Sequence, residues 1–209
     1  MTGNHTADHT ANRSANHAAT SPDDLVRTLG RGAVGGMIAA AVMAMFAMVA
    51  SVTYQHHGFF TPLFHIAAVT GSSTAMMTSM REAMGGHRFW FAPGAALVGA
   101  AIHMMTGAAF GMMFAAVARV LPRRWWLAAG AVFGLAVFAG SAYVDLPAVA
   151  SITGSGAVIA HMVDLAGRTT FAIEHLMFGI ALAAYLLATT PTAPHDHDLV
   201  TASSTTVTA

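Results

Sequence analysis

The run of residues from 93 to 118 constrains the fold more than any other part of the sequence. No charged residue occurs between Arg88 and Arg119. A helix of about 20 predominantly apolar residues is long enough to cross a lipid bilayer. We therefore expect this run to be a membrane-spanning helix, with one ionisable side chain, His103, near its middle.

The composition of the whole chain also indicates a membrane environment. Of its 209 residues, 56% are hydrophobic and only 9% are charged, whereas soluble domains carry about 25% charged residues. There is no cysteine, which excludes disulfides and thiolate metal sites. Basic and acidic residues balance at nine each, which argues against a nucleic-acid partner. The composition therefore predicts an all-α integral membrane protein in contact with the lipid bilayer.

The hydropathy pattern predicts a four-helix bundle within residues 30–188. The four predicted spans cover residues 32–54, 93–118, 127–144 and 169–188. We expect Asp145-Leu146-Pro147 to end the third span. The tails at residues 1–29 and 189–209 are polar and cannot bury a core, so we expect both to be disordered.

Two further apolar stretches, residues 61–80 and 148–163, are too short or too interrupted to cross the membrane. We expect them to be re-entrant or interfacial segments on the outer side. With four spans, one side carries Arg13, Arg27, Arg31, Arg119, Arg123 and Arg124, and the other carries Arg81, Arg88 and Arg168. The positive-inside rule then places both termini in the cytoplasm, with the protein in the cytoplasmic membrane of a bacterium.

The two halves of the sequence resemble each other. Three patterns recur in the same order, namely Gly32-Ala33-Val34 with Gly130-Ala131-Val132, Val69-Thr70-Gly71-Ser72 with Ile152-Thr153-Gly154-Ser155, and His103-x-x-x-Gly107 with His175-x-x-x-Gly179. This order indicates a duplication into two similar two-helix halves. A parallel repeat of this kind has a pseudo-two-fold axis along the membrane normal. We expect it to make the second and fourth helices equivalent and to bring both histidines toward the bundle centre.

Small residues at four-residue spacing predict the faces on which the helices pack. Such stripes let helices approach closely in lipid, where packing drives association. The candidate packing glycines are Gly32, Gly36, Gly99, Gly107, Gly111, Gly130, Gly134 and Gly179.

Three ionisable residues within the predicted spans are candidates for function, namely His103, His175 and Glu174. A charged group in the bilayer core costs about 2.5 kcal/mol or more, so such residues face the bundle interior and commonly mark a functional site. Each histidine also has a simpler role as a hydrogen-bonding core residue. Glu174 lies near the end of its span, and we expect it to reach the interface as a near-surface charge.

A second candidate set lies on the predicted outer side and offers nitrogen and oxygen ligands to a transition-metal ion. It consists of His56, His57, His65, His161 and Asp164. The fifteen methionines of this His-rich and Met-rich chain offer soft thioether ligands as well, although methionine is equally suited to filling space against glycine faces.

Enzyme signatures such as a glycine-rich phosphate loop or His-Glu-x-x-His are missing, so a non-enzymatic role is favoured. The leading hypothesis is a small membrane subunit or carrier that handles a metal ion or a proton through buried histidines. The first alternative is a redox protein with b-type haem on His103 and His175. The second is a structural or assembly partner, in which small-residue stripes bind another membrane protein or a second copy.

Overall fold

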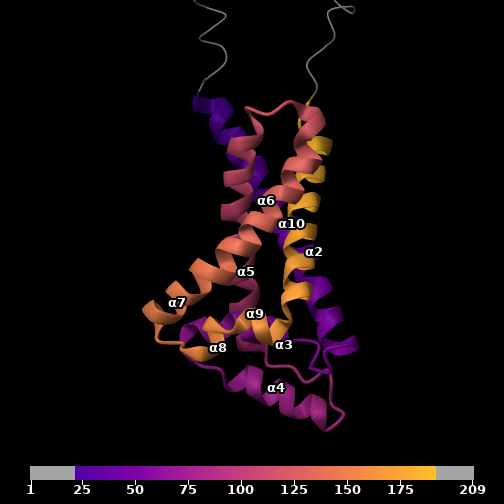
Figure 1. Cartoon of the computed structure of the whole chain (residues 1–209), viewed down its shortest axis with the longest axis vertical. Helices are drawn as coiled ribbons and strands as arrows, with labels where there is room; N and C mark the ends of the chain where they lie inside the picture. Colours follow the sequence, from indigo (N-terminus) through magenta and orange to yellow (C-terminus); the bar gives the residue numbers. More distant parts are fainter. Residues whose placement is uncertain (1–21, 192–209) are drawn as a thin grey trace, which may run out of the picture.

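The computed structural model describes residues 22–191, and the ordered elements of this part are all helical (Figure 1). The long helices are α2 (Pro22–Thr53), α5 (Pro93–Ala118), α6 (Trp126–Gly140) and α10 (Arg168–Thr189). The shorter ones are α3 (Thr61–Ala67), η2 (Ala68–Thr70), α4 (Thr74–Met84), η3 (Arg123–Trp125), η4 (Ser141–Asp145), α7 (Leu146–Thr153), α8 (Ala157–Ala160) and α9 (Met162–Ala166).

Four helical segments of the described chain are long and apolar enough to cross a membrane. They are α2, α5, the continuous helical segment from Arg123 to Thr153, and α10. The start of α2 and the end of α10 lie at the same end of the molecule, and α3, α4, α7, α8 and α9 lie at the opposite end (Figure 1). The all-helical architecture and the number of long apolar helices agree with the sequence-based prediction.

The predicted ends of two helices need correction. The first helix begins at Pro22, so residues 22–29 are helical and only residues 1–21 of the predicted N-terminal tail lie outside the described chain. Proline is well tolerated at the start of a helix. The carboxylates of Asp23 and Asp24 in the first turn interact favourably with the positive end of the helix dipole. Similarly, α10 extends to Thr189, and the predicted C-terminal tail lies outside the description from residue 192 onward.

The third helix does not end at Asp145 as predicted. A π-helical turn, η4, follows α6 directly and leads into α7, so the helical path continues to Thr153. Pro147 lies at the start of α7, where a missing N–H is tolerated. A π-turn alters the hydrogen-bonding pattern at this point and is often found at functional sites. In Figure 1, α7 diverges from α10 beyond this turn.

The long helices pack in the order α5, α2, α10 and α6, and α5 makes few contacts with α6. Glycines set the closest approaches. A Cβ atom added at Gly36 would lie 2.0 Å from the carbonyl oxygen of Gly107, and one added at Gly111 would lie 2.1 Å from that of Gly32. These distances are far below van der Waals contact, so α2 and α5 approach this closely only because both faces lack side chains.

A similar crossing joins α6 to α10. An added Cβ atom at Gly179 would lie 1.9 Å from the Gly130 oxygen, and one at Gly134 would lie 2.1 Å from the His175 oxygen. In the first crossing Gly32 and Gly36 oppose Gly111 and Gly107, whereas in the second Gly130 and Gly134 oppose Gly179 and His175. The contacts therefore align His175 with Gly107, one helical turn away from the predicted match with His103.

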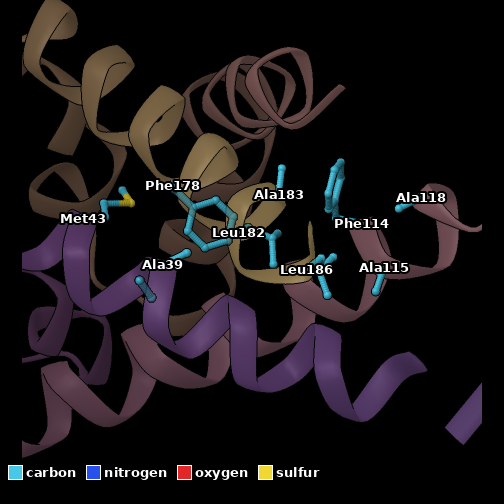
Figure 2. Packing of buried hydrophobic residues seen from close by; sticks show 10 residues of the cluster. Ala39, Met43, Phe114, Ala115, Ala118, Phe178, Leu182, Ala183 and Leu186 are labelled. Carbon is cyan, nitrogen blue, oxygen red and sulfur yellow. The ribbon is translucent and has the colours of Figure 1, made fainter. Parts of the chain in front are cut away.

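The glycine stripes are covered within the chain. The remaining candidate, Gly99, lies against α3, where an added Cβ atom would be 2.0 Å from the Leu63 oxygen. Apolar side chains fill the space around the α2–α5 and α2–α10 contacts (Figure 2). The labelled members of this cluster are Ala39, Met43, Phe114, Ala115, Ala118, Phe178, Leu182, Ala183 and Leu186. Because these stripes are occupied by helices of the same chain, they do not favour a second copy or a partner protein.

Candidate functional site

A cavity of about 610 Å³ lies between α5 and the α6–α7 segment. The backbones of α5 and α6 come close at few positions, although the rings of Phe110 and Phe114 on α5 pack against Phe133 on α6. Residues of α2, α3 and α10 also line the cavity. Most lining side chains are apolar. The polar side chains on its wall are Ser51, Gln55, His57, Thr61, His65, His103, Thr106, Ser141, Asp145, Glu174 and His175. Thr106, Asp145 and Ile152 are solvent-exposed lining residues, so the cavity is open along this flank.

Glu174 is the most unusual side chain of the cavity wall. It is only 5% exposed and lies on α10 between the turns that carry Phe171 and Phe178. Its carboxyl group makes no hydrogen bond or ion pair with any residue from 22 to 191. The expectation that Glu174 reaches the interface as a near-surface charge is therefore wrong, because α2, α6 and α9 pack against α10 and bury the side chain.

His175, the next residue, has its two ring nitrogens in different surroundings. Nδ1 lies 2.7 Å from the carbonyl oxygen of Phe171, one turn earlier on α10. A carbonyl accepts, so Nδ1 carries the hydrogen and donates it, which leaves Nε2 of the neutral ring as an acceptor. Nε2 has no partner among the described residues, and the ring is 6% exposed on the cavity wall.

A hydrogen bond from His103 links α5 to α2 at the cavity wall. Its Nε2 donates to the carbonyl oxygen of Ala40 on α2, 3.0 Å away, one turn from the close approach at Gly36. Its Nδ1 is then an acceptor. The hydrogen bond gives His103 a packing role at the α2–α5 contact, in addition to its place on the cavity wall.

His65 lies on α3, and it is 7% exposed. Its Nε2 donates to the carbonyl oxygen of Val158 on α8 at 2.8 Å, which ties these two short helices together. Burial lowers the pKa of His65, the hydrogen bond to Val158 partly opposes this, and the nearby His57 lowers it further. Burial, followed by the neighbouring His56, also lowers the pKa of His57. Both His57 and His65 line the cavity, whereas His56 does not.

His161 and Asp164 form a surface group with Arg168. Nδ1 of His161 lies 3.6 Å from Oδ2 of Asp164, and Nε of Arg168 donates to Oδ1 of Asp164 at 2.9 Å. The Arg168 guanidinium, through its hydrogen bond and its charge, holds the pKa of Asp164 below its ordinary value. Exposed pairs of this kind contribute little to stability.

The predicted metal ligands are thus divided between the cavity wall and the surface. Within residues 22–191, no three histidine or acidic side chains are grouped closely enough to hold a metal ion. The haem alternative needs a free ring nitrogen on both His103 and His175. His175 offers Nε2, whereas the Nε2 of His103 donates to Ala40 and only its Nδ1 is left as an acceptor, so a haem held by both Nε2 atoms does not fit.

The sequence analysis missed two features of the cavity. Asp145 and Ser141 lie on the cavity wall, with the serine hydroxyl 3.5 Å from the carboxylate, although Asp145 was expected only to end a helix. Hydrogen bonds also fix the loop after α2 to α10 and to the end of α9. The Tyr54 hydroxyl bonds with the Thr170 hydroxyl, and the Gln55 side-chain amide donates to the backbone oxygen of Ala166. The polar pair Tyr54-Gln55 at the end of the first span is the sequence signal that could have indicated these hydrogen bonds.

In comparisons with known proteins, no family model, curated protein or solved structure matches this chain. The class of protein therefore rests on the fold. Its four long apolar helices are compatible with a multi-pass membrane protein in contact with the lipid bilayer.

Proposed function

We propose that this protein is a non-enzymatic membrane carrier or binding subunit whose cavity accepts a small, largely apolar cation, or a proton, at Glu174. The observation that carries the proposal is the buried, unpartnered Glu174 carboxyl group on the wall of a mostly apolar cavity that is open along one flank. Cavities of about 300–1,000 Å³ lined by apolar groups with a few polar ones are typical of small-molecule sites.

The hydrogen bonds around the cavity specify the chemistry of the ligand. Each of His65, His103 and His175 donates to a backbone carbonyl oxygen, so the other nitrogen of each neutral ring is an acceptor. An ionised carboxylate such as Glu174 also only accepts. These three rings and Glu174 therefore offer acceptors, and a ligand that supplies N–H groups or positive charge complements them.

Burial makes this complementarity energetically important. A carboxylate in an apolar setting is costly unless it is neutralised or paired. A proton or an ammonium group on the ligand meets that requirement, and Nε2 of His175 on the adjacent residue supplies a second acceptor. We favour an organic cation over the transition-metal ion, because the described residues contain no group of three metal-ligating side chains.

Under the positive-inside rule, the arginine distribution favours an orientation with both chain termini in the cytoplasm. In that orientation α3, α4 and α7–α9 lie on the outer side, and the cavity belongs to the outer half of the membrane domain. The bacterial cytoplasmic membrane is the location that we propose on this basis.

Isothermal titration of the detergent-purified protein with 1-adamantylamine tests the proposal, since this probe is a compact apolar ammonium ion. The matched neutral probe is 1-adamantanol. We expect saturable binding of the amine and at least about tenfold weaker binding to Glu174→Gln, because a hydrogen bond to a charged group contributes about 1.5–3 kcal/mol.

The control variant is Glu82→Gln, which changes the same chemical group at a carboxylate that pairs with His87 outside the cavity. It should bind the amine as the wild type does. Equal binding of the alcohol and the amine, or unchanged binding by Glu174→Gln, contradicts the proposal.

A further inference from the structure

A second pocket lies at the end of the bundle where α2 begins and α10 ends, whereas Glu174 lies near the opposite end of α10. It has a volume of about 280 Å³. Its lining residues are Thr28, Arg31, Ala115, Arg119, Trp126 and Thr190, with Ala118 and Leu186 at its apolar base. In Figure 2, Ala115 and Leu186 lie side by side at one end of the buried cluster, so the pocket adjoins apolar side chains of both α5 and α10.

The two arginines of this pocket have no counter-ion within the described chain. Neither Arg31 nor Arg119 forms a hydrogen bond or an ion pair with a residue from 22 to 191, and no acidic residue lines the pocket. The nearby Arg123 differs, because its guanidinium donates to the backbone oxygens of Thr190, at 2.7 Å, and Leu187. Two like charges are therefore held in one pocket while a third arginine caps the end of α10.

The glycine contact between α2 and α5 causes this arrangement. Gly32 approaches Gly111 and Ala115 so closely that an added Cβ atom would lie 2.6 Å from the Ala115 side chain. Arg31 immediately precedes Gly32, and Arg119 lies one turn after Ala115. The close approach thus brings the two guanidinium groups to the same side of the bundle, despite their mutual repulsion.

The pocket also lies where the apolar part of the bundle ends. The apolar helix α5 ends at Ala118, directly before Arg119. Trp126 begins α6, and its ring lies 5.8 Å from the Arg123 guanidinium carbon. Tryptophan beside arginine at the end of a span is typical of the membrane–water interface.

We propose that the Arg31–Arg119 pocket binds a phosphate-bearing anion, either the headgroup of an anionic phospholipid or a free phosphate. Basic pockets between membrane helices recognise anionic headgroups in this way. Guanidinium groups suit phosphate because their N–H groups match two of its oxygens at once. The site is separate from the Glu174 cavity and does not depend on the function proposed for it.

Trp126 provides a direct readout of this pocket. The chain has three tryptophans, and Trp90→Phe with Trp125→Phe leaves Trp126 as the sole indole. Fluorescence of this full-length background in a neutral detergent is titrated with dioctanoyl phosphatidylglycerol, dioctanoyl phosphatidylcholine and inorganic phosphate. Saturation by phosphatidylglycerol alone supports a lipid site, and saturation by inorganic phosphate supports a site for the free anion.

Charge-neutral variants decide whether the two arginines form the site. Arg31→Gln with Arg119→Gln should weaken binding about 30-fold, and each single variant about fivefold, because each arginine near an anionic lipid surface contributes about a factor of five. Arg27→Gln with Arg124→Gln removes two charges from the same end of the bundle outside the pocket and should leave the affinity within twofold.

The absence of a saturable change with both phosphatidylglycerol and inorganic phosphate overturns the proposal. Equal weakening by the two double variants overturns it as well, because general surface charge then explains the binding. Circular dichroism measures the helix content of each variant. If the double variant does not fold, the two single variants provide the test.

Discussion

The α2–α5 crossing permits a sharp test of the fold through Gly36→Ala. The added Cβ atom would start 2.0 Å from the Gly107 carbonyl oxygen, whereas real Cβ atoms essentially never approach another atom below 3.0 Å. The atom that it meets belongs to backbone, so the clash is relieved only if the helices separate by about 1 Å, and overpacking of this kind costs about 1–3 kcal/mol.

Separation of these helices also stretches a nearby hydrogen bond. Ala40, whose oxygen accepts from Nε2 of His103 at 3.0 Å, lies one turn after Gly36 on the same helix face. Interhelical hydrogen bonds in membranes contribute about 0.6 kcal/mol on average. We therefore expect Gly36→Ala to lower the free energy of unfolding by about 1.5–3.5 kcal/mol.

Reversible unfolding in mixed detergent micelles, followed by circular dichroism, measures this change. Gly30→Ala is the matched control, because Gly30 lies on the same helix and an added Cβ atom there has nothing within 4 Å. Alanine favours helix over glycine by about 0.5–1 kcal/mol, so this control should be neutral or slightly stabilising. An equal effect of the two substitutions would refute the close packing of α2 on α5.

Further predictions concern groups outside the spans. Because burial lowers the pKa of His65, the folded state binds its proton less readily than the unfolded state, and stability should fall as the pH drops below the ordinary value of 6.5. His65→Gln should make the dependence of unfolding free energy on pH shallower between pH 7 and pH 5, and an unchanged slope contradicts the assigned environment. Asp164→Asn removes an exposed ion pair with Arg168, so the Tm measured by circular dichroism should not change; a clear loss would show that this surface group has a larger role.

The shape of the third helix explains why this bundle contains a cavity. If α6 continued straight along α10, the following residues would lie closer to α5. Instead, the π-turn at Ser141–Asp145 follows α6, and α7 diverges from α10 beyond it (Figure 1). The short helices α3, α8 and α9 then contribute Thr61, Ile159 and Met162 to the cavity wall. Glu174 and His175 face this space from α10, so the local change in helix geometry and the candidate binding site are parts of one arrangement.

Some properties of this protein follow from its sequence alone. The four long apolar helices are predictable because the requirement for about 20 apolar residues depends on local composition and not on partners. The four-residue spacing of glycine likewise identifies a helix face, since such residues repeat about once per turn. The faces containing Gly36, Gly107 and Gly134 are indeed the ones at the helix contacts.

Tertiary structure decided which faces meet and what each polar group touches. His103 and His175 look alike in sequence, yet one bonds to a neighbouring helix and the other to its own preceding turn. Their apparent equivalence is lost because the two glycine crossings place His175 opposite Gly134 and leave His103 one turn further along. The burial of Glu174 and the absence of a partner for it among residues 22–191 arise in the same way, because both depend on how segments distant in the chain enclose the end of α10.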